Sequence, residues 1–276
     1  MAESVQSVGR ALDLIERLSD ADAEVGLTEL ARRAGLQPPT AHRLLQTLVA
    51  RGWVVQNPAT SRYRLSHRLL AVAGGIEAQT ARVRAAARPH LERLRDLSGE
   101  STNLVVLDGL SVVYLDQAPS LRPMRMFTAI GARVPAYASA AGKAMLAFAS
   151  PGAIVALNRV SLEPLTEHTL TDHAALKREL RRARTRGYAF DNEEYELGVA
   201  CAAAPILDLD GTAFAALSVS APATRWRTLD RATLGRQLAE HGREISSELG
   251  YVDGVADGTA GSRVGGGPPA ARASSR

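Results

Sequence analysis

Residues 27–53 read LTELARRAGLQPPTAHRLLQTLVARGW, and this stretch decides the fold of the N-terminal part. Apolar side chains recur at helical spacing from Leu30, which predicts a short helix over residues 28–34. Thr28 is a suitable N-cap for this helix, and Gly35 occupies a C-cap position at its end. A two-residue turn then leads to a second helix, so the stretch predicts a helix-turn-helix.

The second helix is predicted over residues 38–50 and opens at Pro38 and Pro39. Pro39 suits the first helical position, and Pro38 is expected to be extended because a proline follows it. The predicted buried face is Ala41, Leu44, Leu45 and Leu48. The opposite face would meet base edges in the major groove of DNA, and it carries Thr40, Arg43 and Thr47, flanked by His42 and Gln46.

The elements on either side predict a winged helix. An apolar stripe at helical spacing precedes the quoted stretch and consists of Val8, Ala11, Leu12, Ile15 and Leu18. After Gly52 the pattern changes to period two, which predicts two short strands around a turn at Asn57 and Pro58. Three helices followed by a hairpin define a winged helix-turn-helix domain over residues 1–66.

The distribution of charge fits a surface that binds DNA phosphates. Residues 25–68 hold seven arginines and one acid, whereas the first 24 residues hold two arginines and six acids. Further candidate DNA contacts are Thr28, Gln37, Pro39 and the wing arginines Arg62 and Arg64. Two alternatives remain, which are a solvated arginine-rich face and a winged-helix module that binds protein. A DNA affinity that falls steeply with salt would distinguish DNA binding from these alternatives.

The rest of the chain predicts an α+β domain. Residues 67–81 form a helical linker, and a further helix ending at Gly99 turns Leu91, Leu94 and Leu97 inward. Over residues 82–250 we predict an antiparallel sheet flanked by helices. One pair of its strands is predicted in 103–117, as a hairpin about Asp108-Gly109. Further strands are predicted at 124–130, 199–207 and 212–220. Its other helices fall at 142–149, 172–186 and 229–249, and residues 251–276 are predicted to be a disordered tail.

Composition excludes several classes of protein. The apolar fraction of 46 % allows a sizeable core, and no apolar run approaches the roughly 20 residues of a membrane span. The N-terminus lacks a signal-peptide core, so we expect a cytoplasmic protein. One cysteine, Cys201, excludes an internal disulfide and thiol chemistry that needs a resolving cysteine.

Other enzyme and cofactor signals are weak. Lys143 follows a glycine, but the residues before it do not supply a phosphate-binding loop. The six histidines show no close ligand cluster by spacing, and His168 and His173 are the nearest pair. We therefore expect a protein that is not an enzyme and that has no metal or cofactor.

Several long motifs resemble the IclR (isocitrate lyase regulator) family of transcription factors. They include SVGRALDLIERLSD, LTELARRAGLQPPTAHRLLQTLVARGWV, GARVPAYASAAGKAMLA and ARTRGYAFDNEEYELGVACAAAPILD, and the match runs from about residue 4 to 250. The resemblance implies a homodimer or dimer of dimers that binds a palindromic operator. It also implies a C-terminal GAF-like domain that takes a small organic acid. Pro38 and Pro39 replace two polar residues that are usual in the family.

The resemblance also implies the residues of an effector site: Met126, Val134, Ala140, Ala141, Asp191, Cys201, Ser218 and Ser220. Ser218 and Ser220 are two apart on a predicted strand, so their hydroxyls share one face of the sheet. Asp191 beside an anionic ligand must accept a hydrogen bond from a ligand hydroxyl or be protonated. The alternatives are that Cys201 is a small buried apolar residue and that the two serines face solvent.

These observations predict a transcriptional regulator, a repressor by analogy with the family, whose DNA binding responds to a glyoxylate-like, pyruvate-like or ureide-pathway acid. Two alternatives remain open. One is a winged-helix interaction module with a structural C-terminal domain, and the other is an activator of the same family that responds to an aromatic acid.

Overall fold

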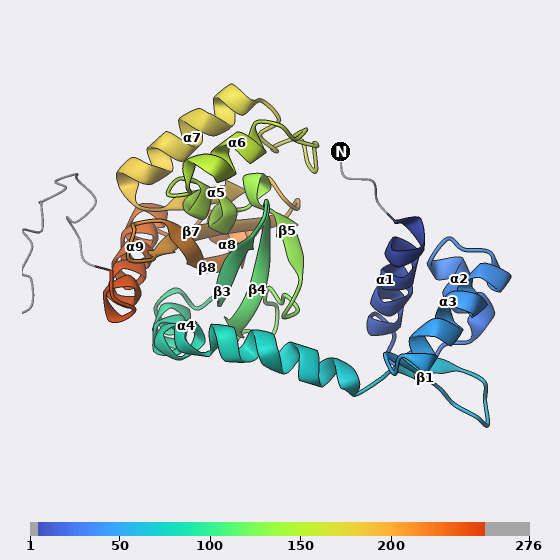
Figure 1. Cartoon of the computed structure of the whole chain (residues 1–276). Coiled ribbons are helices and arrows are strands. Elements are labelled where there is room, and N and C mark those ends of the chain that lie inside the picture. The colour runs from blue at the N-terminus through green and yellow to red at the C-terminus, as the bar shows by residue number, and fades with distance from the viewer. Residues whose placement is uncertain (1–4, 252–276) are drawn as a thin grey trace, which may run out of the picture. The chain divides into compact units, whose positions relative to one another are not determined.

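The structure is a computed structural model that describes residues 5–251. The chain divides into two compact units after Ala81, and each unit is described by itself. The point of division lies inside helix α4 (Arg68–Ser98), so the predicted linker helix and the helix after it are one continuous element (Figure 1). The predicted tail at 251–276 lies outside the described residues, apart from its first residue. No helix within 5–251 has the length and apolar character needed to cross a membrane.

The first unit is a winged helix-turn-helix. Its elements are α1 (Gln6–Ser19), α2 (Leu27–Arg33), α3 (Pro38–Ala50) and the antiparallel pair β1 (Val54–Gln56) and β2 (Tyr63–Leu65). Val25 and Tyr63 exchange both backbone hydrogen bonds at 2.9 and 2.8 Å, which extends the pair beyond the predicted hairpin. Leu14, Leu30, Leu45 and Tyr63 are fully buried and centre the core.

Three sequence predictions within this unit are wrong in detail. Helix α2 begins at Leu27 with Gly26 as N-cap, so Thr28 lies exposed in its first turn. Pro38 is helical rather than extended, and the extended residue is Gln37, the N-cap of α3. Both prolines are tolerated because the first N–H groups of a helix have no partner within it.

The apolar stripe predicted on α1 is only partly buried. The core side chains of α1 are Leu14 and Leu18, whereas Val8 and Leu12 are 56 % and 53 % exposed. The prediction assumed a single buried face at this spacing. The helix instead has a second apolar edge, which the residues of its own unit leave uncovered.

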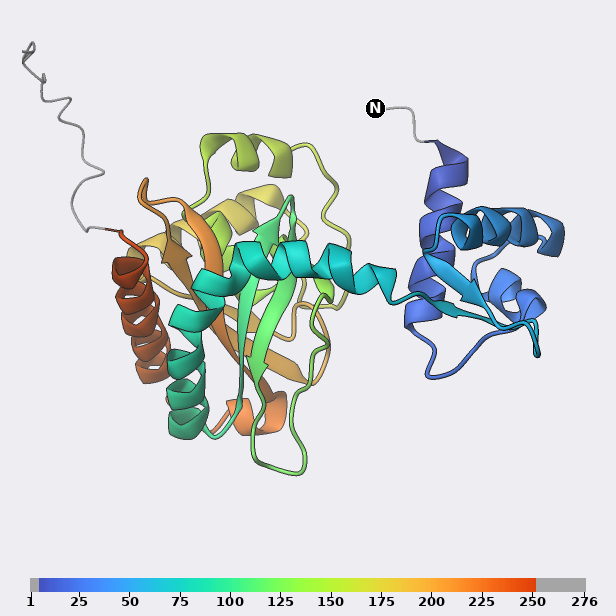
Figure 2. The ribbon, with the colours of Figure 1, turned by 60° about the horizontal axis from the view of Figure 1, so that its bottom comes forward.

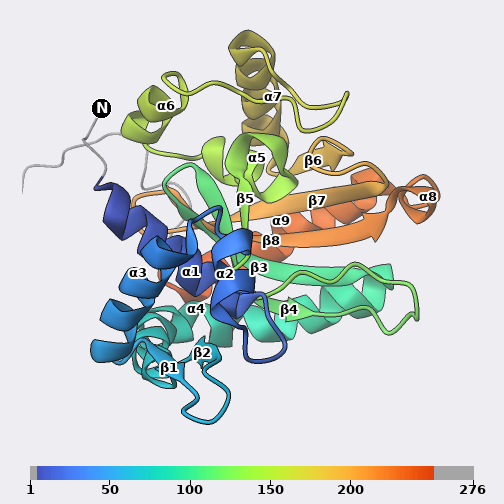
Figure 3. The same cartoon turned by 90° about the vertical axis from the view of Figure 1, so that its right-hand side faces the viewer.

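The second unit is built on a six-stranded antiparallel sheet in the order β5-β4-β3-β8-β7-β6 (Figure 3). The strands are β3 (Ser101–Asp108), β4 (Ser111–Ala118), β5 (Arg133–Pro135), β6 (Ala189–Asn192), β7 (Val199–Leu207) and β8 (Ala213–Pro222). The hairpins of β3 with β4 and of β7 with β8 confirm the predicted turns at Gly109 and Gly211, both of which have positive φ. The predicted α+β class is confirmed.

Helices cover both faces of this sheet. One face is covered by the second half of α4 and by α9 (Arg231–Glu248), which lie side by side in Figure 2. The other face is covered by η1 (Ala136–Ala138), α5 (Ala140–Leu146), α6 (Pro151–Leu157) and α7 (His173–Arg186). A short helix, α8 (Ala223–Trp226), follows β8.

Small residues allow this close packing of helices on the sheet. A Cβ atom at Gly142 would lie 2.1 Å from the carbonyl oxygen of Ala136, and one at Gly242 would lie 2.5 Å from that of Pro205. Neither backbone contact leaves room for a side chain.

Several predictions for this unit are wrong. Residues 124–130 form no strand; their alternating apolar side chains are largely exposed, and the strand in this region is β5. Leu97 is 61 % exposed because only the other apolar face of α4 meets the sheet. Strand β6 was not predicted. The histidines do include a close pair, since α4 and α9 bring His90 and His241 together from 151 positions apart.

Candidate DNA-binding surface and effector cavity

The outward face of α3 carries the side chains predicted to read DNA. His42, Arg43, Gln46 and Thr47 are exposed, Thr40 is half-buried, and Ala41, Leu45 and Leu48 are buried. Thr47 donates a hydrogen bond to the carbonyl of Arg43 at 3.2 Å. Within the described part of the chain, the Arg43 guanidinium makes no hydrogen bond or ion pair. Its five donors are therefore available to a nucleic acid. Thr28, Gln37 and Pro39 are also exposed.

The wing arginines are held differently. Arg62 donates to the carbonyl of Glu24 at 3.2 Å, and the guanidinium of Arg64 lies 3.8 Å from the Glu24 carboxylate. Asn57 donates to both oxygens of that carboxylate, at 3.1 and 2.9 Å. An acid outside the basic block thus offsets part of the positive charge of the wing. The sequence analysis gave Arg62 and Arg64 as candidate DNA contacts and did not identify their contacts with Glu24, which is 38 residues from Arg62.

In the second unit, one cavity of about 270 Å³ lies between α5 and the sheet. All eight residues assigned to an effector site by the resemblance line it: Met126, Val134, Ala140, Ala141, Asp191, Cys201, Ser218 and Ser220. The sequence analysis missed further lining side chains, which include Tyr114, Phe127, Thr128, Tyr195 and Val199. Phe127, Thr128 and Tyr195 lie in loops, where periodicity gives no signal. Tyr114 lies within β4, and Val199 begins β7.

The two serines of β8 are buried and hydrogen-bonded, so the alternative that they face solvent is wrong. Asn103 of β3 donates to the hydroxyl oxygens of Ser218 and Ser220 at 3.1 and 3.2 Å. The thiol of Cys201 also donates to Ser220, at 3.2 Å. Because both oxygens act as acceptors, each O–H is left to donate into the cavity.

Asn103 is the positioning residue that the sequence analysis did not find. Its side chain is fully buried, and Gln117 donates to its Oδ1 at 2.8 Å, which fixes the amide so that its NH₂ faces the serines. The register that pairs Asn103 with Ser218 creates this contact, and register is not visible in the sequence.

Asp191 enters the cavity from β6 and is 3 % exposed. Its Oδ1 accepts a hydrogen bond from the backbone N–H of Glu194 at 2.7 Å. Burial raises the pKa of Asp191 to about 7, although that hydrogen bond and the nearby Lys143 ammonium act in the opposite direction. Burial also raises the pKa of the Cys201 thiol, which stays protonated.

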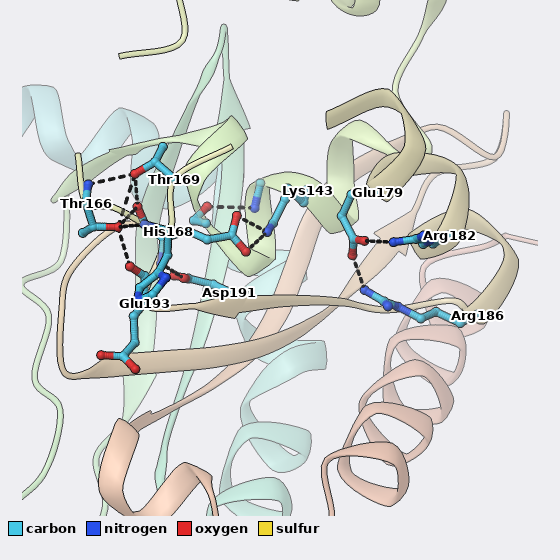
Figure 4. Close-up of polar contacts among 12 residues, drawn as sticks. Lys143, Thr166, His168, Thr169, Glu179, Arg182, Arg186, Asp191 and Glu193 are labelled. Carbon is cyan, nitrogen blue, oxygen red and sulfur yellow. Dashed lines mark hydrogen bonds and ion pairs between the residues drawn. The ribbon is translucent and has the colours of Figure 1, made fainter. Parts of the chain in front are cut away.

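A buried ion pair lies next to the cavity. Lys143 of α5 is fully buried, and its ammonium donates to both carboxylate oxygens of Glu194 (Figure 4). Burial raises the pKa of Glu194, and the ammonium of Lys143 opposes that shift.

The backbone beside this pair is held by two threonines. Thr166 donates to the carbonyl of Glu193 and Thr169 to that of Glu194, both at 2.6 Å. These contacts fix the loop that follows Asp191. Lys143 itself does not line the cavity, because its ammonium is buried against Glu194.

The fold and the cavity define a class of protein: a DNA-binding helix-turn-helix unit joined to a ligand-sensing unit, as in bacterial transcriptional regulators. Residues 7–58 match the IclR helix-turn-helix domain, and residues 77–247 match the bacterial transcriptional regulator IclR C-terminal domain. The chain belongs to the IclR family of transcriptional regulators. The members it matches are regulators of transcription rather than enzymes.

Individual relatives cover most of both chains. The chain is 38 % identical to the transcriptional repressor IclR of Escherichia coli over 250 residues, which covers 89 % of this chain and 90 % of that protein. It is 37 % identical to the regulator BhcR of Paracoccus denitrificans over 243 residues, with 88 % and 86 % covered.

Two solved structures are also similar. Thermotoga maritima IclR matches at a TM-score of 0.70 and 29 % identity, covering 90 % of this chain and all of that one. An IclR homologue from Microbacterium hydrocarbonoxydans complexed with 4-hydroxybenzoate matches at 0.70 and 26 % identity, covering 88 % and 98 %.

Proposed function

We propose that this protein represses transcription by binding an operator through α3, and that a small carboxylic acid in the cavity modulates that binding. The observation that carries the proposal is the serine pair, whose two hydroxyls are fixed by Asn103 and left as donors in the cavity. Repression agrees with the relatives named as repressors, such as the acetate operon repressor of Salmonella typhimurium.

The chemistry of the cavity favours a short acid. At about 270 Å³ it lies just below the range of roughly 300–1,000 Å³ that holds drug-sized ligands. The hydroxyls of Ser218 and Ser220 supply donors, and the neutral Cys201 adds no negative charge. A glyoxylate-like or pyruvate-like acid fits these features. The aromatic side chains of Tyr114, Phe127 and Tyr195 support an aromatic acid as the second candidate, which the same titration tests.

Ser218→Ala combined with Ser220→Ala should abolish the response of DNA binding to the acid. Both donors are lost, while the buried alanines preserve the packing of β8. Fluorescence anisotropy of operator DNA, with glyoxylate, pyruvate and 4-hydroxybenzoate titrated in turn, measures the response. Ser247→Ala, on an exposed face of α9, is the matched control. An unchanged response in the double variant would contradict the assignment of the cavity.

The affinity for the acid should fall as the pH rises through about 7. Asp191 has a pKa raised to about 7, so at lower pH it is neutral and donates to a carboxylate, whereas above pH 7 its charge repels the ligand. Because binding is coupled to one proton, the affinity for the acid should fall by at most about tenfold per pH unit. Calorimetric titrations with pyruvate between pH 6 and 8 measure the dependence. Asp191→Asn should flatten the profile, and a profile that stays steep in this variant would assign the titration to another group.

We also propose that the regulator acts as a dimer. The first unit exposes apolar side chains on α1 and on the start of α4: Val8, Leu12, Leu70, Val72 and Ile76. A second copy would cover them, and a palindromic operator requires two copies of α3.

Leu12→Glu combined with Ile76→Glu should yield monomers, because the dimer would bury both charges. Sedimentation velocity measures the assembly. Leu121→Glu, at an 84 % exposed loop position in the other unit, should leave it unchanged. A double variant that remains dimeric would place the contact between copies elsewhere.

A further inference from the structure

A cluster of two imidazoles and a carboxylate lies in the second unit. His90 comes from α4, and His241 and Glu244 lie three positions apart on α9. The Nδ1 atoms of the two histidines are 2.7 Å apart. Oε2 of Glu244 lies 3.5 Å from Nδ1 of His90 and 3.6 Å from Nδ1 of His241. The cluster is on the face of the sheet opposite α5, and none of its residues lines the effector cavity.

We propose that His90, His241 and Glu244 bind a divalent transition-metal ion of the zinc class, which clamps α4 to α9. Two neutral imidazole nitrogens and one carboxylate form a donor set used for Zn²⁺, with a fourth position left for water. Mg²⁺ and Ca²⁺ prefer sets made of oxygen, so this cluster selects against them.

The spacing of the ligand atoms needs little adjustment. Metal–ligand distances of about 2.0–2.2 Å place tetrahedral ligand atoms about 3.3–3.5 Å apart. The two separations that involve Glu244 are already near this value. The two Nδ1 atoms must move apart by about 0.6 Å. The hydrogen bond between the imidazoles is then replaced by coordination of both to the same ion.

The exposure of the cluster also suits a metal. An imidazole ligates a cation in its neutral form. One Nδ1 carries the proton of the present hydrogen bond. Coordination of one ion by both Nδ1 atoms requires that this imidazole carry its proton on Nε2. The imidazoles are 11 % and 12 % exposed, whereas Glu244 is 51 % exposed, which leaves a path for the ion from solvent.

The charges around the cluster are mainly acidic. Glu240, Glu244 and Glu248 recur every fourth residue along α9, and Arg93 of α4 is a nearby cation. Four-residue spacing places three carboxylates on one side of the helix. Two of them add attraction for a dication without being ligands.

A structural hydrogen bond between two neutral histidines is the competing explanation for the same contact. It requires no metal, and it predicts that Zn²⁺ neither binds at this place nor stabilises the protein. Because α4 continues into the DNA-binding unit, a metal clamp would give the regulator a second input, separate from the carboxylic acid.

The test uses the full-length protein, stripped with a chelator and titrated with zinc chloride and with cobalt chloride. We expect one zinc per chain by mass spectrometry of metal content, a raised melting temperature and a visible Co²⁺ absorption band. Glu244→Gln keeps the shape of an exposed side chain and should weaken zinc affinity about tenfold or more. His241→Asn should remove the site, whereas Glu248→Gln should change the affinity less than threefold.

Two outcomes would overturn the proposal. One is a stoichiometry far below one zinc per chain, and the other is zinc binding of equal affinity in Glu244→Gln, His241→Asn and wild type. Should His241→Asn fail to fold, Glu244→Gln and the cobalt spectrum of the wild type decide the matter. A thermal shift with zinc that persists in both ligand variants would assign the effect to the other histidines.

Discussion

Replacing Lys143 by methionine should destabilise the second unit by about 3–5 kcal/mol, the range for removing one partner of a buried ion pair. Lys143 is fully buried, and its ammonium is paired with Glu194 and close to Asp191. Without the ammonium of Lys143, the buried Glu194 and Asp191 lose the positive charge that lowers their pKa values. Denaturant unfolding followed by fluorescence of the buried Trp226, in a Trp53→Phe background, reports on this unit.

The loss should depend on pH with a definite sign. Burial raises the folded pKa of both acids, that of Asp191 to about 7. Ionising them therefore costs stability as the pH rises above their ordinary pKa values of about 4, whereas the protonated acids cost nothing. The deficit of Lys143→Met should therefore be larger at pH 8 than at pH 6. Glu194→Gln in the same chain should recover part of it.

Lys177 provides the control for this prediction. The chain has only two lysines, and Lys177 is the exposed one, on α7. Lys177→Met should change the free energy of unfolding by less than about 0.5 kcal/mol. If Lys143→Met and Lys177→Met changed the free energy of unfolding equally, the buried pair of Lys143 and Glu194 would contribute no more to stability than a surface charge.

Arg43→Ala should weaken operator binding by about 1–3 kcal/mol for each half-site, or about 2–6 kcal/mol for a dimer on a palindrome. Arg43 is exposed on α3, and its guanidinium makes no hydrogen bond or ion pair within the described residues, so it can pair with a guanine in both copies. Anisotropy titrations on a site selected from random DNA by the wild-type protein measure the loss.

The specificity of the variant distinguishes base reading from phosphate binding. Loss of a base contact should relax the preference at one position of each half-site, whereas loss of a phosphate contact weakens all sites equally. Arg178→Ala, which removes an exposed arginine from α7, should leave binding unchanged. An Arg43→Ala protein with wild-type affinity would move the reading surface to another face.

Local sequence patterns predicted most elements of the fold. Alternating apolar residues and glycine turns identified the paired strands β3, β4, β7 and β8, and proline and glycine marked the ends of α2 and α3. They failed at an edge of the sheet and in a loop. Strand β6 is an edge strand of four residues, and the exposed apolar residues of 124–130 imitate a strand.

The cavity shows a different limit. The family resemblance identified Ser218 and Ser220, and their two-residue spacing placed both hydroxyls on one face of the sheet. Asn103 became part of the site only through the pairing of β3 with β8. Glu194 became the partner of Lys143 across 51 residues. Contacts of this kind depend on register and packing, which a single sequence does not specify.

The continuity of α4 bears on how such regulators can be recombined. The division between the units falls within a helix, so a junction made there lies among helical hydrogen bonds rather than in a loop. Adding one residue to a helix turns the helical residues beyond it by about 100° and advances them by about 1.5 Å. A chimaera that joins this DNA-binding unit to the sensing unit of another regulator must therefore keep the junction helical, with the apolar residues of the second half of α4 on the face that packs against the sheet.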